Sequence, residues 1–336
     1  DLEALGLPHR AGIAPPGSLV PELERALGAR LGAPGGRVLV TAGASEANAC
    51  VLAGLLEPGE EALVESPGYE PHRVAPVLFG ARVRAFARRR EHGYGRVAEA
   101  VEAALMPATR LVMLTDLHNP SGAPLEEADA AALAARAERR GLWLVCDETF
   151  RDAGDRPAGT LSALSGRWVT TSTLTKSYGL GSLRVGWVSG APAALARCAD
   201  AQNALSVEPA GPSLALALAL VPHLDALRGR AHTILAANRE RWRFALAAGL
   251  PCDASVESRG TTTFVHFPGV SGGDAFAAFA AERFRLLVAP GRFFGESRGA
   301  RLALGGEPGA FAAALETFQQ AVRAFDPGRA PAGEPA

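Results

Sequence analysis

The chain has 336 residues, of which 48% are hydrophobic, and its 34 lysines and arginines nearly balance 35 acidic residues, for a formal net charge of −1. The length is enough for two or three domains, and the charge balance gives no electrostatic basis for binding nucleic acid or an anionic membrane. No apolar run approaches the roughly 20 residues of a transmembrane helix, and the first residues lack a signal-peptide pattern. We therefore expect a cytoplasmic protein that binds neither nucleic acid nor membrane.

The four cysteines, Cys50, Cys146, Cys198 and Cys252, lie far apart and mostly in apolar surroundings. None belongs to a CxxC pair or to a cysteine–histidine pattern with the spacing of metal ligands. We expect buried free thiols rather than disulfides, and no metal site.

Residues 1–20 are rich in proline and glycine and predict an extended N-terminal arm, followed by a helix from Pro21 to about Gly32. Strands are expected at 37–41, 61–65, 82–86, 110–115 and 142–146, and the helices between them end near residues 56, 79, 105 and 140. This alternation predicts a three-layer α/β fold, in which a mostly parallel sheet has helices on both faces. We assign residues 21–231 to this large domain.

Residues 232–326 predict a smaller α+β domain. Helices at 193–204 and 213–227 precede a long helix from His232 to about Ala248, which we expect to bridge the two domains. Strands at 261–267, 286–289 and 301–304 and helices at 274–284 and 310–325 are then expected. Residues 327–336, rich in proline, glycine and alanine, predict a disordered tail.

The stretch from Ser172 to Trp187 contains Lys176, the only lysine of an arginine-rich chain. Short apolar segments at 168–169 and 185–188 predict a strand on each side of an exposed loop. A nucleophilic lysine needs a free, partly desolvated amine. The hydroxyls before Lys176 and the guanidinium of Arg184 suit a bound phosphate. A solvated lysine in an ordinary surface loop is the alternative.

Small and polar residues follow several other predicted strands. Ala44 and Ser45 lie in a turn between a strand and a helix, where free backbone N–H groups can surround a phosphate, although a plain turn is equally common. Asn119, Asp147 and Lys176 lie at or just past strand ends. Because ligands bind beyond the carboxyl ends of parallel strands, we expect these three side chains to share one site.

Seven motifs occur in order along the chain: Gly-Ala-Ser, Ser-Pro-Gly-Tyr, Asn-Pro-Ser-Gly, Asp-Glu-x-Phe, Thr-Leu-Thr-Lys, an arginine eight residues after that lysine, and Pro-Gly-x-x-Phe-Gly before Arg-Leu. Together they resemble the class I/II aminotransferase family of fold type I pyridoxal-phosphate enzymes, from about Leu23 to Phe325. The resemblance implies the large domain of pyridoxal-phosphate-dependent transferases, pyridoxal 5′-phosphate as the cofactor and, typically, a homodimer.

The resemblance also implies roles for the matching residues. Lys176 would hold the cofactor aldehyde as a Schiff base and move a proton between substrate and cofactor. Asp147 would pair with the pyridine nitrogen, so that the ring acts as an electron sink. Asn119 would hydrogen-bond the ring's 3′ oxygen, and Tyr69 would stack on the ring face. Without the resemblance, Asp147 and Asn119 would be turn residues and Tyr69 part of the core.

Contacts to phosphate and carboxylate have matches as well. The family's phosphate-binding positions correspond to Ala44, Ser45, Thr173, Thr175 and Arg184. Arg301 matches the arginine that binds the substrate α-carboxylate through two parallel hydrogen bonds. A surface ion pair is the alternative for Arg301.

Two features depart from the family pattern. Phe150, which we include among the cofactor-binding residues, stands where the family usually has tyrosine, so a hydrogen bond to the cofactor's 3′ oxygen is lost. No tyrosine precedes Tyr69. The family's N-terminal tyrosine, which reaches the partner subunit's phosphate, therefore has no match, and His9 is one candidate for its replacement.

The resemblance implies an aminotransferase that moves an amino group between an α-amino acid and a 2-oxo acid. The alternative is another enzyme of the same fold type: a decarboxylase, a C–S or β-elimination lyase, or a cyclising enzyme. A non-catalytic pyridoxal-phosphate-sensing domain is a more remote alternative, because no helix-turn-helix or basic patch precedes the large domain. His118, Tyr178 and Asn203 are candidates for contacting the substrate side chain, and a packing or surface role is an equal alternative for each.

Overall fold

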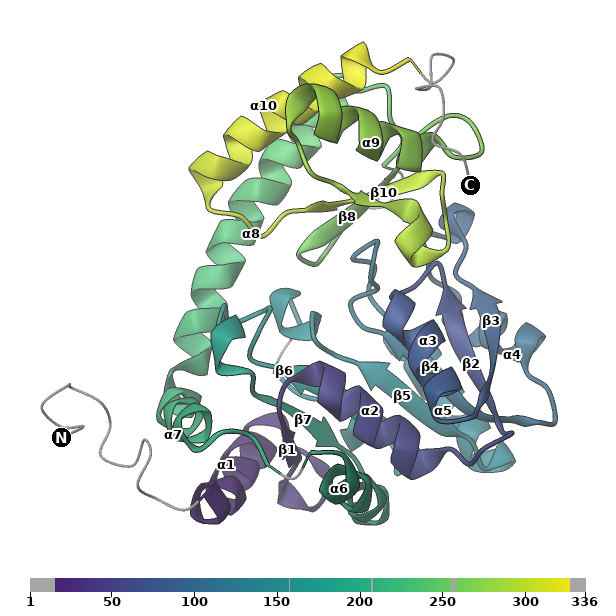
Figure 1. Cartoon of the computed structure of the whole chain (residues 1–336), viewed down its shortest axis with the longest axis vertical. Helices are drawn as coiled ribbons and strands as arrows, with labels where there is room; N and C mark the ends of the chain where they lie inside the picture. Colours follow the sequence, from purple (N-terminus) through teal and green to yellow (C-terminus); the bar gives the residue numbers. More distant parts are fainter. Residues whose placement is uncertain (1–15, 157, 207, 255–257, 327–336) are drawn as a thin grey trace, which may run out of the picture.

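A computed structural model describes residues 16–156, 158–206, 208–254 and 258–326, so the predicted tail, His9 and most of the predicted arm lie outside the described residues. In these ranges seven strands form a large sheet of order β1–β7–β6–β5–β4–β2–β3 (Figure 1). The strands are β1 Leu39–Thr41, β2 Glu61–Ser66, β3 Arg82–Ala87, β4 Thr109–Thr115, β5 Trp143–Asp147, β6 Trp168–Thr173 and β7 Gly186–Ser189. β7 is antiparallel to β1 and β6, and the other neighbours pair in parallel.

Strand β4 shows why helices cover both faces of this sheet. Successive side chains of a strand point to opposite faces. Leu111 and Met113 pack into one buried cluster with helices α2 (Ala44–Leu55) and α6 (Pro192–Leu205), which α3 (Glu70–Leu78) adjoins. Val112 and Leu114 pack into the opposite cluster with α4 (Val97–Ala104) and α5 (Glu127–Arg140). A strand buried on both faces reads as a continuous apolar run, which confirms the predicted three-layer α/β arrangement.

A smaller antiparallel sheet follows, in the order β8 (Thr262–His266), β10 (Gly299–Ala303) and β9 (Ala289–Pro290). Helices α9 (Gly272–Phe284) and α10 (Pro308–Ala324) cover it, and the long helix α8 (Leu224–Ala247) runs from the large sheet to this unit (Figure 1). The core between them is aromatic: the rings of Phe267 and Phe276 stack at 4.2 Å, and Phe318 meets Phe276 edge-on.

The helix bounds differ from prediction at both ends of the large domain. Helix α1 spans Pro16–Leu31, so residues 16–20 are helical rather than extended. Leu19, Leu23 and Leu27 are buried at helical spacing, and this packing with α7 (Gly211–Leu220) offsets the N–H that Pro21 lacks. The helix predicted at 213–227 instead ends at Leu220, and α8 begins at Leu224. Pro222 lies in the 3₁₀ turn between them.

The strand predicted at 286–289 is also wrong, because only Ala289 and Pro290 pair with β10. Leu286 and Val288 pack against the small-domain core, whereas Leu287 is 86% exposed. The alternating apolar residues in this segment are therefore explained by alternating burial and not by pairing in a strand. Strand β6 continues to Thr173, beyond the predicted segment at 168–169, and α8 begins at Leu224 rather than at the predicted His232. The other strands and helices begin and end within two residues of their predicted bounds.

All four cysteines are free thiols, as expected. Three of them are buried, whereas Cys252, which we also expected to be buried, is half-buried. Among the described residues no helix is both long and apolar enough to span a bilayer. The same part of the chain contains no group of three or more potential metal-binding side chains.

Candidate active site

The carboxyl ends of three adjacent parallel strands open into one cavity of about 320 Å³. Asn119 follows β4, Asp147 is the last residue of β5, and Lys176 follows β6. All eleven residues expected at the site line this cavity: Ala44, Ser45, Tyr69, Asn119, Asp147, Phe150, Thr173, Thr175, Lys176, Arg184 and Arg301. Parallel strands bring these positions together because their carboxyl ends meet at one edge of the sheet.

One end of the cavity is shaped for an anion. Gly43 has φ 89° and caps α2, whose first helical hydrogen bond runs from Ala47 N to the Gly43 carbonyl, so the N–H groups of Ala44 and Ser45 precede the helical ladder. A Cβ on Gly43 would lie 2.6 Å from Arg184 Nη2, so a larger residue would displace the guanidinium, and the positive φ also favours glycine. Exposed backbone N–H groups, the helix dipole and a guanidinium together suit a phosphate.

Hydroxyl groups complete this end. Thr173 Oγ1 donates to the Val185 carbonyl at 2.8 Å and lies 2.9 Å from Thr175 Oγ1. Arg184 is exposed, and within the described part of the chain its Nη2 donates one long hydrogen bond of 3.4 Å, to the Ala42 carbonyl. The guanidinium therefore retains donors for a ligand.

At the deep end of the cavity, Asp147 is 5% exposed and forms several hydrogen bonds. Its Oδ2 lies 3.1 Å from Asn48 Nδ2 and 3.3 Å from His72 Nε2, and its Oδ1 accepts from Thr149 N at 2.9 Å. Burial works to raise the pKa of Asp147, but the contacts with His72 and Thr149 outweigh it and lower this pKa. The cavity thus presents a buried carboxylate to a cationic or N–H-bearing ligand.

Two further side chains form the wall beside the small sheet. Arg301 Nη1 donates to Asn119 Oδ1 at 2.9 Å, and the guanidinium lies 4.9 Å above the Phe294 ring. No acidic side chain in the described part of the chain pairs with Arg301, so the structure does not support the alternative of a surface ion pair. Burial lowers the pKa of Arg301. A partly buried guanidinium with unused donors is suited to bind a carboxylate.

Tyr69, Phe150 and Lys176 border the remaining space. Tyr69 precedes α3, and its ring meets His72 edge-on at 5.2 Å; burial, then the Asp147 charge, raises the Tyr69 pKa. Lys176 is exposed, and its amine forms no hydrogen bond or ion pair with any described residue. The amine is therefore free, although not removed from water as the sequence had led us to expect.

The candidates for contacting the substrate side chain do not line the cavity. His118 is buried between Ser121 Oγ at 2.7 Å and the Pro67 carbonyl at 2.8 Å. Tyr178 is buried and donates to Asp152 at 2.6 Å. Asn203 is exposed on α6. His118 and Tyr178 thus have packing roles and Asn203 has a surface position, and none of the three lines the cavity.

The sequence did not identify Asn48, Thr115 and Thr149 as cavity residues, or His72 behind them. Helical spacing could have identified two of these. Asn48 lies four residues after Ala44 on α2, and His72 lies three after Tyr69 on α3, so each shares a face with an expected site residue.

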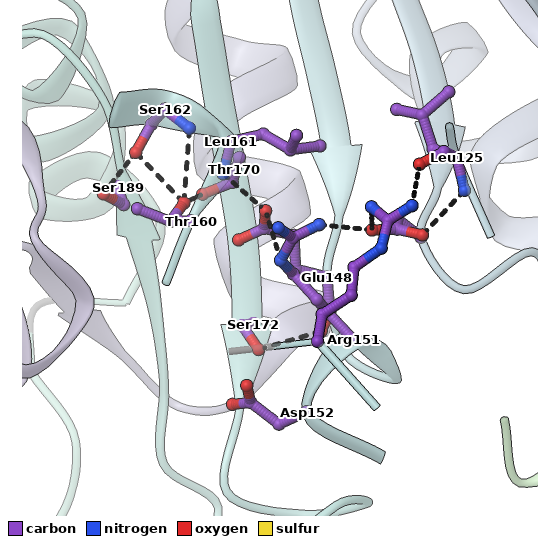
Figure 2. Close-up of polar contacts among 12 residues, drawn as sticks. Leu125, Glu148, Arg151, Asp152, Thr160, Leu161, Ser162, Thr170, Ser172 and Ser189 are labelled. Carbon is purple, nitrogen blue, oxygen red and sulfur yellow. Dashed lines mark hydrogen bonds and ion pairs between the residues drawn. The ribbon is translucent and has the colours of Figure 1, made fainter. Parts of the chain in front are cut away.

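Glu148, the residue after Asp147, belongs to a separate buried network (Figure 2). Its Oε1 accepts from Leu161 N at 2.8 Å and lies 3.7 Å from Arg151 Nε, and Arg151 also pairs with Asp116. Burial raises the pKa of Glu148 to about 7, against the opposing charge of Arg151. This carboxyl group faces away from the cavity residues and titrates near neutrality.

Glu148→Gln is expected to flatten the dependence of stability on pH. Because the folded protein binds this proton more tightly than the unfolded chain, wild-type stability falls as pH rises from about 4.5 through about 7, by up to about 3 kcal/mol. Glutamine removes this titration. Denaturant unfolding at several pH values measures the slopes, with exposed Glu99→Gln as the control. Equal slopes for Glu148→Gln and wild type would contradict the expectation.

The family model for aminotransferase class I and II matches residues 5–318. The arginine–pyruvate transaminase AruH of Pseudomonas aeruginosa is 38% identical over 171 residues, which are 50% of this chain and 43% of the transaminase. Capreomycidine synthase of Streptomyces vinaceus is 31% identical over 270 residues, which are 79% of this chain and 69% of the synthase. The match to the transaminase thus spans less than half of its length.

The fold has a close counterpart among solved structures. A pyridoxal-phosphate-dependent aminotransferase from Streptococcus suis aligns with a TM-score of 0.86 at 21% identity, over 96% of this chain and 86% of that chain. This likeness confirms the expected fold class. Together with the family match along nearly the whole chain, it leads to one conclusion: the chain belongs to the class I and II aminotransferases, whose cofactor is pyridoxal 5′-phosphate.

Proposed function

We propose that the protein is an aminotransferase that exchanges an amino group between an α-amino acid and a 2-oxo acid. One observation carries the proposal: a single cavity contains the only lysine, a buried carboxylate at Asp147 and the guanidinium of Arg301. Among the residues that the structure describes, the lysine amine has no hydrogen-bond or ion-pair partner and Arg301 has no acidic partner. These groups provide a nucleophilic amine, a partner for a pyridinium and a carboxylate-binding site.

The residues present fit pyridoxal phosphate. Ala44, Ser45 and Arg184 would hold the phosphate where Gly43 leaves room, and Asp147 would pair with the ring nitrogen. Asn119 and Tyr69 would contact the 3′ oxygen and the ring face, beside Phe150. When bound, the cofactor supplies an electron sink for the negative charge that develops at the substrate Cα.

In this proposal the chain's own residues orient the substrate and move one proton. Arg301 binds the substrate α-carboxylate, which places the Cα hydrogen within reach of Lys176. Lys176 Nζ would hold the cofactor through its aldehyde carbon until the substrate amine displaces it at that carbon. The freed Nζ would then remove the proton from the substrate Cα and later donate it to the cofactor's former aldehyde carbon. Asn119, already bonded to Arg301, links the carboxylate site to the cofactor's oxygen.

The test of the proposal is the first half-reaction. The loaded protein is mixed with individual amino acids, beginning with arginine because of the similarity to AruH, and its absorption spectrum is followed. Conversion to the pyridoxamine form with stoichiometric release of a 2-oxo acid supports transamination. Lack of conversion across all proteinogenic amino acids would refute it.

A second candidate is another reaction with the same cofactor, such as decarboxylation, elimination or cyclisation. The similarity to capreomycidine synthase and the phenylalanine at position 150 favour it. The same experiment separates the two, because carbon dioxide, an eliminated fragment or a cyclic product would then form without the pyridoxamine form.

Arg301→Lys is expected to raise the KM for the amino acid by about 10- to 100-fold, because lysine cannot form two parallel hydrogen bonds to a carboxylate. Steady-state kinetics with increasing donor concentration measures the effect. Arg292→Lys is the matched control, since Arg292 lies in the same unit but outside the cavity. Equal KM values for the two variants would remove Arg301 from the substrate site.

The proposal includes a homodimer in the cytoplasm. Helix α3, which begins next to Tyr69, exposes Val74, Val77 and Leu78 by 50%, 58% and 78%, a surface that supports a subunit contact. The free thiols support a reducing compartment. Light scattering in solution is expected to give twice the mass of one chain, and a monomer would contradict this part.

A further inference from the structure

Asn48 connects Asp147 to the neighbouring strand. Its Nδ2 lies 3.1 Å from Asp147 Oδ2, and its Oδ1 accepts from Thr171 Oγ1 at 2.6 Å. Asn48 is 7% exposed and lines the cavity from α2, whereas Thr171 is fully buried on β6. Asn48 thus joins helix α2 to the consecutive strands β5 and β6, about 100 residues later in the sequence.

The contact with Thr171 determines which end of the amide faces Asp147. A hydroxyl that donates to the amide oxygen leaves the amide N–H₂ group on the carboxylate side. Thr171 is itself held in place, because it lies opposite Asp147 in the parallel ladder and its carbonyl accepts from Glu148 N at 2.7 Å. The donor geometry of Asn48 is therefore built in before any ligand binds.

Two donors converge on one carboxylate oxygen. His72 Nε2 lies 3.3 Å from Asp147 Oδ2 and 3.5 Å from Asn48 Nδ2. Because both nitrogens contact Oδ2, and Thr149 N is the described contact of Oδ1, the rotation of the carboxylate is restricted. Oδ1 retains a lone pair for a ligand in the cavity.

We infer that Asn48 is a positioning residue that, oriented by Thr171, holds the Asp147 carboxylate as an anion aligned with the cofactor's ring nitrogen. The inference rests on the proposed function, since it needs pyridoxal phosphate in this cavity. A buried carboxylate and a pyridine nitrogen compete for one proton, and the neutral pair avoids two buried charges. Donors to the carboxylate stabilise its charge and so keep the proton on the ring nitrogen.

Asn48→Leu tests this inference, because leucine preserves the volume and removes the donor. The readout is the ¹⁵N resonance of ring-labelled pyridoxal phosphate bound to the protein, which reports protonation of the ring nitrogen independently of turnover. We expect the resonance to move toward the unprotonated position. We also expect the cofactor Kd to rise about tenfold, equivalent to about 1.4 kcal/mol.

Thr171→Val provides a second, independent reading if Asn48→Leu fails to fold. This variant leaves Asn48 present but no longer oriented, so we expect a smaller shift of the ¹⁵N resonance in the same direction. The double variant should show the shift of Asn48→Leu alone rather than the sum of the two shifts. Far-UV circular dichroism and thermal unfolding verify that each variant is folded.

Asp147→Asn separates the inference from the proposed function. If Asp147→Asn moves the nitrogen resonance and the folded Asn48 and Thr171 variants leave it unchanged, the inference is overturned while the function stands. If Asp147→Asn also leaves the resonance unchanged, Asp147 does not contact the ring nitrogen and the proposed cofactor geometry fails. A shift in all three, graded as described, supports both.

Discussion

Lys176→Ala is expected to lower kcat by about 10³-fold or more, because it removes both the covalent attachment of the cofactor and the base that moves the substrate proton. The amine proposed to perform these steps follows β6 and has no partner among the described residues, in the cavity with Asp147 and Arg301. Single-turnover absorbance with a saturating amino acid measures the loss. Lys176→Arg should be equally inactive, since guanidinium keeps the charge but does not act as a nucleophile.

The composition of the chain makes the attachment point unusually easy to test. Lys176 is the only lysine, so no other side-chain amine can form the Schiff base. Borohydride reduction of the loaded protein followed by peptide mass spectrometry is expected to place the adduct on Lys176. An adduct on another residue, or a stable adduct in Lys176→Ala, would contradict the assignment.

Asp147→Asn is expected to lower kcat by about 10²- to 10³-fold, the range for loss of one preorganised electrostatic group at a reacting centre. The asparagine amide is neutral and no longer stabilises a protonated ring nitrogen, so less charge can be delocalised from the substrate Cα. The hydrogen bonds from Asn48 and His72 would then converge on a neutral side chain. Cofactor affinity should fall in parallel.

Glu148→Gln is the matched control, because it also converts a buried carboxyl group to an amide one residue away. Glu148 bonds to Leu161 and Arg151 outside the cavity, so kcat should remain within about twofold of wild type at a temperature where the protein is folded. If both amide variants lost activity equally, charge at Asp147 would not be the cause. Comparing the two variants separates the effect of losing a charge inside the cavity from the effect of altering a buried carboxyl group.

Part of the site could be predicted from the pattern of strands in the sequence. The buried runs of β4 and β5 are short and largely apolar, and β6 begins with the apolar pair at 168–169. Asn119, Asp147 and Lys176 lie at the ends of these strands or in the loops directly after them. Parallel strands necessarily align their carboxyl ends, so Asn119, Asp147 and Lys176 could be assigned to one site from local patterns alone. The family motifs then added residues, such as Tyr69 and Arg301, whose spatial position no local pattern indicates.

Other features depended on packing between distant segments. Pro21 suggested that α1 begins at that proline, but Leu19 and its neighbours bury enough apolar surface against α7 to extend the helix toward Pro16. The apolar alternation at 286–289 suggested a strand. A strand forms only where its backbone can hydrogen-bond to a neighbouring strand, and β10 pairs only with Ala289 and Pro290 of this segment.

By itself the sequence determined the order of most strands and helices, the family, the single side-chain amine and most of the residues that line the cavity. Only the tertiary structure decided that Asn48 and His72 contact Asp147, that no described acidic side chain pairs with Arg301 and that His118 and Tyr178 are buried elsewhere. The physical reason is that hydrogen bonds join atoms by distance and direction. The Thr171–Asn48 contact spans 123 residues of sequence and exists only once the sheet and α2 are packed together.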